Sequence, residues 1–268
     1  MSNVKYAVGY LKQTANLGDD IWAYAAMKLL PRYDYIIDYR NINNFRSYNG
    51  EKVAILLSGF PITRDSLFGQ FIPSMNLIPK FVGVHFREYS YDWLSQPLLK
   101  RYLCAYSPIG ARDFYTAKNL LDIGINSYFA GCLTLTLNPP HTKNRKRSRK
   151  VIVVDCSDVV IEKVKTECIK LELDMIVKTH VVDWDTYKYK AWDNRISIVE
   201  EYLDEYATAH CVITSRLHVG LPCLAFGTPT LLLKPPFVKD DETSRRFIPF
   251  LDYFHFGLID DFLSDKID

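Results

Sequence analysis

The stretch from Cys211 to Leu233 reads Cys-Val-Ile-Thr-Ser-Arg-Leu-His-Val-Gly-Leu-Pro-Cys-Leu-Ala-Phe-Gly-Thr-Pro-Thr-Leu-Leu-Leu, and it decides the fold. It approaches the length of a membrane span, but Arg216, His218 and repeated Gly and Pro residues interrupt it. A β-branched run, a polar loop, an apolar helical segment and a second apolar run predict a strand over 211–214, a helix over 217–225 and a strand over 230–233. This is the repeating unit of a parallel α/β sheet.

The same alternation extends through the rest of the chain. We expect further strands over 5–11, 35–39, 53–57, 81–85, 127–129, 151–155 and 174–177, a weaker strand over 105–109, and helices over 20–30, 111–121, 159–171 and 196–209. Asn138-Pro139-Pro140 and a basic cluster over 143–150 interrupt the pattern, which then restarts. The sequence therefore predicts an α/β protein with two Rossmann-like doubly wound domains, 1–142 and 143–268, that face each other across a cleft.

The composition excludes the disordered and fibrous classes of protein. Hydrophobic residues make up 48% of the 268 residues and charged residues 24%, which is typical of a soluble globular protein. A net charge of +2 does not indicate a nucleic-acid partner. The cluster consists of Lys143, Arg145, Lys146, Arg147, Arg149 and Lys150. A solvated linker is the favoured interpretation, and a peripheral contact with anionic lipid is the alternative.

The cysteines and the N-terminus indicate the compartment. The six cysteines form no CxxC pair and several lie in apolar runs, so we expect buried thiols in a reducing compartment. Residues 1–6 show no signal-peptide pattern and run directly into a strand. We expect a cytoplasmic protein, located at the inner face of the membrane if the basic cluster binds lipid.

Ligands of open parallel sheets bind beyond the carboxyl ends of the strands, so chemistry is expected in the loops that follow them. In the first loop, Gly18 would allow a positive φ and a close approach to a ligand. Asp19 is the candidate for orienting or deprotonating a hydroxyl, whereas capping of the next helix explains Asp20 equally well. In a second loop, Arg112 lies at a predicted helix start, where a guanidinium suits a phosphate or carboxylate. The alternative is an ordinary surface Arg-Asp pair.

The third loop, 214–218, is the most specific. Arg216 and His218 lie two residues apart in a segment that is otherwise hydrophobic, and such groups are costly to bury without a partner. A lone histidine is usually a core residue. The position of His218 between a strand end and a helix start instead favours a functional role. Among the other histidines, His85, His180 and His210 lack a comparable set of neighbours.

Three blocks of sequence resemble the polysaccharide pyruvyl transferase family, in that family's order. They are Asn16-x-Gly18-Asp19; Arg112-Asp113 with Leu120-Leu121-x-x-Gly124 and Ala130-Gly131-Cys132-Leu133-Thr134; and Ser215-Arg216-Leu217-His218 with Gly227-x-Pro229. The resemblance implies a GT-B-like fold, with phosphoenolpyruvate as donor and a sugar of a cell-surface or capsular glycan, or of its lipid-linked precursor, as acceptor. It implies an acceptor-side N-terminal domain that contributes Arg112, and a donor-side C-terminal domain that carries the Ser215–His218 loop.

The resemblance also implies residue roles. Arg112 and Arg216 match positions that hold the donor's phosphate and carboxylate, Leu217 and His218 match neighbouring donor positions, and His218 matches the catalytic residue. We expect the two arginines to share one cleft, and we assign Asn16 and Asp19 to the acceptor. Transfer as a ketal requires neither a metal nor a redox cofactor. Two alternatives remain: a nucleotide-sugar glycosyltransferase of the same architecture, and a non-catalytic module that binds a glycan or an anion.

Overall fold

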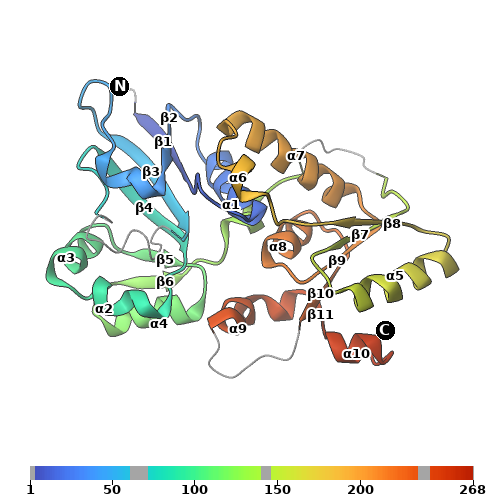
Figure 1. The fold of residues 1–268 in the computed structure, drawn as a ribbon. Coiled ribbons are helices and arrows are strands. Elements are labelled where there is room, and N and C mark those ends of the chain that lie inside the picture. The colour runs from blue at the N-terminus through green and yellow to red at the C-terminus, as the bar shows by residue number, and fades with distance from the viewer. Residues whose placement is uncertain (1–3, 61–71, 140–145, 235–241, 268) are drawn as a thin grey trace. The chain divides into compact units, whose positions relative to one another are not determined.

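The computed structural model describes residues 4–60, 72–139, 146–234 and 242–267, which form two compact units (Figure 1). Unit 1 comprises Met1–Thr14 and Asp19–Leu133, and unit 2 comprises Ala15–Gly18 and Thr134–Asp268. The boundary predicted after residue 142 falls in 140–145, outside the described residues. The contacts place the change of unit after Leu133, and they also group Ala15–Gly18, predicted to lie in the first domain, with unit 2.

Unit 1 is built on a six-stranded, wholly parallel sheet in the order β2-β1-β3-β4-β5-β6. Its strands are β1 (Lys5–Tyr10), β2 (Tyr35–Asp38), β3 (Val53–Gly59), β4 (Leu77–Val84), β5 (Ile109–Ala111) and β6 (Ser127–Phe129). Its helices are α1 (Leu17–Lys28, whose first two residues group with unit 2), α2 (Tyr91–Leu94), α3 (Pro97–Ala105) and α4 (Phe114–Asp122), with 3₁₀ turns at η1 (Tyr39–Asn44) and η3 (Glu88–Ser90).

The weak strand predicted over 105–109 is wrong. Residue Ala105 ends α3, which begins with Pro97 at a position where the missing N–H of proline costs nothing. Tyr106 closes that helix, and β5 begins only at Ile109. Tyr106 thus belongs to a helix end and Ser107-Pro108 to the link that follows it, whereas Ile109 does lie in a strand.

Unit 2 is built on a five-stranded parallel sheet in the order β11-β10-β9-β7-β8. Its strands are β7 (Lys150–Val154), β8 (Asp174–Lys178), β9 (Cys211–Thr214), β10 (Thr230–Lys234) and β11 (His255–Leu258). Its helices are α5 (Asp158–Lys170), α6 (Trp184–Tyr187), α7 (Trp192–Thr208), α8 (Leu217–Ala225), α9 (Glu242–Phe247) and α10 (Ile259–Leu263); η4 (Leu133–Thr136) and η5 (Ile248–Tyr253) are 3₁₀ turns. The prediction for 211–233 is confirmed.

Helices cover both faces of the unit 2 sheet, as a doubly wound fold requires (Figure 1). On one face, Val151 and Val153 of β7 pack with Val160 and Val164 of α5, and α10 adds apolar side chains to the same cluster. Successive side chains of a strand point to opposite faces of the sheet, so those of Ile152 and Val154 lie on the other face. Nearly continuous apolar runs such as β7 follow from burial on both sides.

The described part of the basic cluster is exposed to solvent, as expected of a linker, but several of its residues are anchored to unit 2. Arg147 donates hydrogen bonds to the carbonyl oxygens of Ala209 and Gly227, Arg149 donates to that of Glu172, and Lys150 is the first residue of β7. Lys143 and Arg145 lie outside the described residues. Within the described ranges, no helix combines the length and the apolar character needed to cross a bilayer.

The six cysteines are all free thiols. Three are buried and two are half-buried, but Cys104 is exposed, so the expectation of uniformly buried thiols is wrong for that residue. Burial raises the pKa of Cys223 to about 12 and that of Cys156 to about 11. These two thiols are therefore protonated at neutral pH and suit packing better than nucleophilic chemistry.

Candidate functional site

The strand order predicts where a ligand of each unit would bind. The order reverses between β1 and β3 in unit 1 and between β7 and β9 in unit 2. In open parallel sheets, ligands bind beyond the carboxyl ends of the strands at such a reversal. In unit 2, this edge carries Asp155 after β7 and the Ser215–His218 loop after β9.

Arg216 follows β9 and stands immediately before α8. Its backbone N–H donates to Thr214 Oγ1 at 3.0 Å, and its Nε donates to Asp155 Oδ2 at 2.9 Å. The Arg216 side chain is 39% exposed, and among the described residues the structure gives its Nη1 and Nη2 no hydrogen bond. One side of the guanidinium is thus fixed, and its outer nitrogens are available to an anion.

The first turn of α8 contains the next two predicted residues. Arg216 does not cap this helix with its side chain, and the first N–H groups of a helix have no partner within it. Leu217 is 8% exposed, so its side chain is largely closed to a ligand, and its backbone N–H is the group placed at the helix start. His218 is half-buried, one residue further into the same turn. A helix start with an arginine beside it is a favourable place for a phosphate or carboxylate.

Gly18 is needed for a reason other than the predicted one. It lies in the first turn of α1, and its φ is not in the left-handed region. A Cβ on Gly18 would lie 3.0 Å from His218 Nδ1, 3.1 Å from His218 Cβ and 3.1 Å from Asn16 Oδ1. The glycine therefore lets the backbone approach His218, and Asn16 accepts a hydrogen bond from the Gly18 N–H at 3.0 Å.

Backbone hydrogen bonds attach the segment Ala15–Gly18 to the loop after β8. Asn16 forms an antiparallel bridge with Val181, the Leu17 N–H donates to His180 O at 2.8 Å, and the Val182 N–H donates to Ala15 O at 3.0 Å. The His180 ring is fully buried with its Nε2 2.8 Å from the Tyr206 hydroxyl, and burial lowers the pKa of His180 to about 4. His180 is therefore neutral near pH 7 and helps to hold the loop.

Asp19 and Asp20 lie in the first turn of α1 and not in a loop. The Asp19 carboxylate accepts hydrogen bonds from Thr14 Oγ1 at 2.5 Å and from Trp22 Nε1 at 3.2 Å. Asp20 is fully buried. Because both Asp19 oxygens have partners within unit 1, the geometry suits orienting a group better than taking a proton from it.

In unit 1, Arg112 links β5 to α4 and is almost completely buried. Its side chain is 1% exposed, its backbone N–H donates to Val84 O at 2.7 Å, and its guanidinium carbon lies 4.9 Å from the centre of the Phe60 ring. Among the described residues, Arg112 Nε and Nη2 have no hydrogen-bond partner. Because α4 begins at Phe114, the predicted helix start at residue 111 is too early. The burial of Arg112 and Asp113 excludes a surface Arg-Asp pair.

Next to Arg112, a buried Asp-His pair joins the ends of β4 and β5. His85 Nδ1 donates to Asp113 Oδ2 at 2.6 Å, with side chains only 1% and 0% exposed. Asp113 also caps α4 by accepting from the Thr116 N–H at 2.8 Å. Burial alone would raise the pKa of Asp113, but the hydrogen bond from His85 and the charges of His85 and Arg112 outweigh it and hold that pKa below its usual range.

Neither His85 nor Asp155 is predicted as a site residue from the sequence. His85 lies 28 residues from Asp113, and only the pairing of β4 with β5 brings them together. Asp155 reads as the last residue of a strand, but β7 ends at Val154 and Asp155 has a left-handed φ of 51°. An aspartate at the end of an apolar run is a weak signal for such a position.

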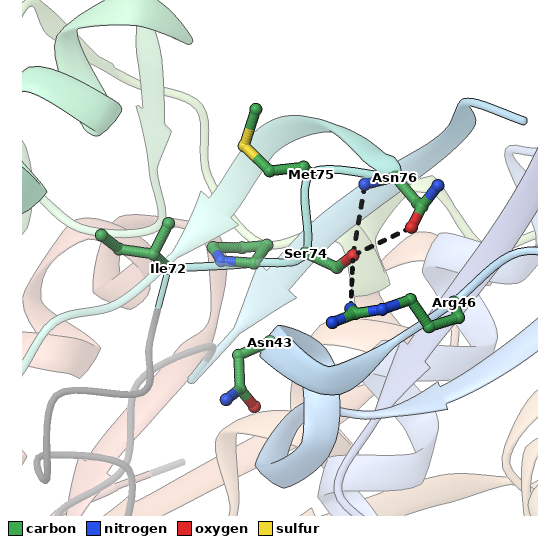
Figure 2. A pocket seen from close by; sticks show the side chains of 7 residues that line it. Asn43, Arg46, Ile72, Ser74, Met75 and Asn76 are labelled. Atoms are coloured by element: carbon green, nitrogen blue, oxygen red, sulfur yellow. Dashed lines mark hydrogen bonds between the residues drawn. The ribbon is translucent and has the colours of Figure 1, made fainter. Parts of the chain in front are cut away.

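One surface pocket of unit 1, of about 360 Å³, lies away from these groups. Figure 2 shows Ser74 hydrogen-bonded to Arg46 and Asn76 at its wall. The lining residues are Asn43, Arg46, Ile72, Pro73, Ser74, Met75 and Asn76. Residues 72–76 precede β4, so they lie near the amino end of that strand, at the opposite edge of the parallel sheet from Arg112. Over the described ranges, no three His, Cys, Asp or Glu side chains are grouped to hold a metal ion.

Two solved structures show the same fold. A functionally uncharacterised protein from Klebsiella pneumoniae aligns with a TM-score of 0.56 at 13% identity, over 96% of this chain and 92% of its own. A protein from Listeria monocytogenes that carries the name of a UDP-N-acetylglucosamine 2-epimerase aligns with a TM-score of 0.51 at 12% identity, over 100% of this chain and 88% of its own. These likenesses confirm the predicted GT-B-like class of two parallel α/β domains. No curated protein sequence matches.

The family is shown by the sequence itself. The profile of the polysaccharide pyruvyl transferases matches residues 16–235, which include Asn16, Arg112 and the Ser215–His218 loop. That match covers most of the 268 residues and both units. The chain belongs to the polysaccharide pyruvyl transferase family.

Proposed function

We propose that this protein transfers the enolpyruvyl-derived group of phosphoenolpyruvate to two hydroxyls of a glycan sugar, forming a pyruvate ketal and releasing phosphate. The acceptor is a sugar of a cell-surface or capsular glycan or of its lipid-linked precursor. Membership of the family supports a pyruvyl transferase. The phosphoenolpyruvate donor and the ketal product follow from the family resemblance, and the charged residues at the two sheet edges support them.

The observation that carries the proposal is the buried Arg112 guanidinium. An arginine stays charged at any physiological pH, and burying a charge without pairing it is costly. Two of its nitrogens have no partner among the described residues, and we infer that an anion pairs with them. Phosphoenolpyruvate supplies two such groups, a phosphate and a carboxylate, and planar oxygen pairs suit a guanidinium fork.

Unit 2 supplies the second set of anion-binding groups. We assign the outer nitrogens of Arg216 and the backbone N–H of Leu217 to the donor, because they occupy a strand end and a helix start. His218 is assigned the proton transfer, since it lies in the same turn and imidazole titrates near neutral pH. We assign Asn16 and Asp19 to the acceptor, with Asp19 as an orienting group because both its oxygens already accept hydrogen bonds.

The proposed reaction balances without an oxidant, a reductant or a metal. His218 delivers a proton to the methylene carbon of phosphoenolpyruvate, which becomes the methyl group of the ketal. Carbon 2 loses its bond to the phosphate oxygen and gains bonds to two sugar oxygens. One hydroxyl proton replaces the proton that His218 gave, and the other leaves on hydrogen phosphate. The arginines stabilise the negative charge of the donor and of the leaving phosphate.

A phosphate-release assay tests the proposal. The purified protein is incubated with phosphoenolpyruvate and a panel of candidate glycans and lipid-linked sugars, and products are analysed by mass spectrometry. We expect stoichiometric phosphate and a pyruvate ketal that form only with a suitable acceptor. Release of a nucleoside diphosphate from a nucleotide sugar would instead identify a glycosyltransferase. Tight phosphoenolpyruvate binding without turnover on any acceptor would favour a binding module.

A further inference from the structure

Asp155 occupies a backbone conformation that aspartate rarely adopts. It follows β7 with a φ of 51°, in the left-handed region where residues with a Cβ are uncommon. Such a conformation is unfavourable for a residue with a Cβ and persists only where the surroundings hold it in place. The contacts of Asp155 show what holds it.

The Asp155 side chain joins the loops that follow three neighbouring strands. Its Oδ1 accepts from Thr179 Oγ1 at 2.6 Å, and its Oδ2 accepts from the His180 N–H at 3.0 Å, both in the loop after β8. Oδ2 also accepts from Arg216 Nε at 2.9 Å, in the loop after β9. The Asp155 carbonyl oxygen accepts from Ser215 Oγ at 2.6 Å. A carboxylate with both oxygens engaged is built to position its neighbours.

The bond to Nε has a specific effect on Arg216. The guanidinium is planar, so fixing Nε also fixes the plane and direction of Nη1 and Nη2. Those nitrogens have no hydrogen bond among the described residues, and the Asp155 side chain is 11% exposed against 39% for Arg216. The arginine is therefore held from its buried side while its outer edge stays accessible. Holding a rotamer-rich side chain in its binding geometry removes part of the entropy cost of binding.

We propose that Asp155 is a positioning residue that presents Arg216 to the anionic donor. This inference rests on the proposed function, because it takes phosphoenolpyruvate as the ligand of Arg216. Asp155 contributes no bond to the donor itself. The negative charge of Asp155 would repel the anionic donor, so any gain in donor affinity has to come from orienting the arginine.

Binding measurements on a double-mutant cycle test the proposal. Calorimetry of phosphoenolpyruvate binding is performed on the wild type, Asp155→Asn, Arg216→Ala and the double variant. Asparagine tolerates the left-handed region but loses the charge that holds Nε. We expect Asp155→Asn to weaken binding about tenfold in the wild-type background and to have no further effect once Arg216 is alanine. Equal weakening in both backgrounds would overturn the positioning role.

Asp265 provides a matched control within the same unit. It also has a left-handed φ, 56°, and pairs with Lys163 Nζ at 2.5 Å. Asp265→Asn should leave phosphoenolpyruvate binding unchanged. If Asp155→Asn fails to fold, Asp155→Gly removes the carboxylate without backbone strain and takes its place in the cycle.

A readout that needs no donor separates this proposal from the proposed function. The Arg216 Nε–H resonance, assigned by its absence in Arg216→Lys, is compared between the wild type and Asp155→Asn by NMR. We expect a downfield, slowly exchanging signal that moves and broadens in the variant. An unchanged signal would overturn the positioning role even if phosphoenolpyruvate binds. A moved signal in a protein that does not bind phosphoenolpyruvate would contradict only the proposed function.

Discussion

Arg112 in unit 1 and Arg216 in unit 2 follow strands of two similar parallel sheets, but their surroundings are opposite. Arg112 is 1% exposed, packs against Phe60 and has two nitrogens without a partner among the described residues. Arg216 is 39% exposed and its Nε is held by Asp155. The first is a buried charge with two unpaired nitrogens in the described part of the chain, and the second is an accessible charge with a fixed direction.

The difference indicates a division of labour between the two edges. Around Arg112, the Asp113–His85 pair is buried and closed, which suits a rigid holding site. Around Arg216, His218 is only half-buried and α8 begins, so polar groups there are more accessible than those around Arg112. We expect chemistry to depend on the unit 2 edge, and holding of the donor to depend on both.

The largest effect should come from His218. Glutamine keeps much of the size of histidine but cannot act as an acid, so His218→Gln should lower kcat by about 10² to 10⁴ while donor affinity persists. Steady-state kinetics at saturating donor and acceptor check this, and the pH–rate profile should lose one limb. His85→Gln is the comparison in unit 1. If a folded His85→Gln loses as much turnover as His218→Gln, the division of labour is wrong.

The second effect concerns the response of the two units to acid. Burial lowers the pKa of His180 in unit 2 from 6.5 to about 4, so the unfolded chain takes up this proton first as pH falls. The contribution of neutral His180 to stability is complete above pH 6.5 and is lost between 6.5 and about 4, a loss of roughly 3 kcal/mol. Asp113 in unit 1 has a lowered pKa, so its contribution is lost only as pH falls below its ordinary value of 3.8.

Unit 2 should therefore weaken at a higher pH than unit 1. Denaturant unfolding between pH 7 and 4, followed by hydrogen exchange in each unit, checks this order. His180→Gln should remove most of the pH dependence in that window. Simultaneous weakening of both units in the wild type would show that the contrast in buried groups does not control acid stability.

The third effect is on donor affinity. Loss of the charge-assisted contacts of Arg216 in Arg216→Ala should weaken phosphoenolpyruvate binding by about 2 kcal/mol, roughly thirtyfold. Calorimetry on a variant with an unchanged circular dichroism spectrum measures it. Lys163→Ala, which removes a cation on α5 that pairs with Asp265, is the matched control and should bind normally. Normal binding by Arg216→Ala would contradict the assigned role.

The smallest effect is the change in stability when each arginine is replaced by methionine. It is also the sharpest test of the comparison between Arg112 and Arg216. Arg112→Met keeps the apolar stem beside Phe60 and removes a buried guanidinium whose Nε and Nη2 have no partner among the described residues, while His85 still holds Asp113. The free energy of unfolding without ligand should therefore rise by about 1 kcal/mol. Arg216→Met should not stabilise, because it leaves Asp155 without its cation. Phosphoenolpyruvate should protect the wild type against heat but not Arg112→Met. A destabilised Arg112→Met would show that Arg112 has a structural role.

The sequence predicts the fold far better than the connections within the site. The apolar runs place β9 and α8 at their observed bounds, because burial on both faces leaves little choice of residue. The role of Gly18 is misassigned, since only the folded chain brings its backbone against His218. Asp155 and His85 are missed for a related reason. Their partners come from other strands, and the order of strands in a sheet is not written in local pattern.

The short segment Ala15–Gly18 has a consequence for synthesis on the ribosome. It emerges early but hydrogen-bonds to His180, Val181 and Val182, which are made much later. The N-terminal sheet can form while the chain grows, but the start of α1 must wait for β8 and its loop before it is anchored. Folding domain by domain is therefore incomplete here, because the start of α1 is anchored only once residues 180–182 have been made.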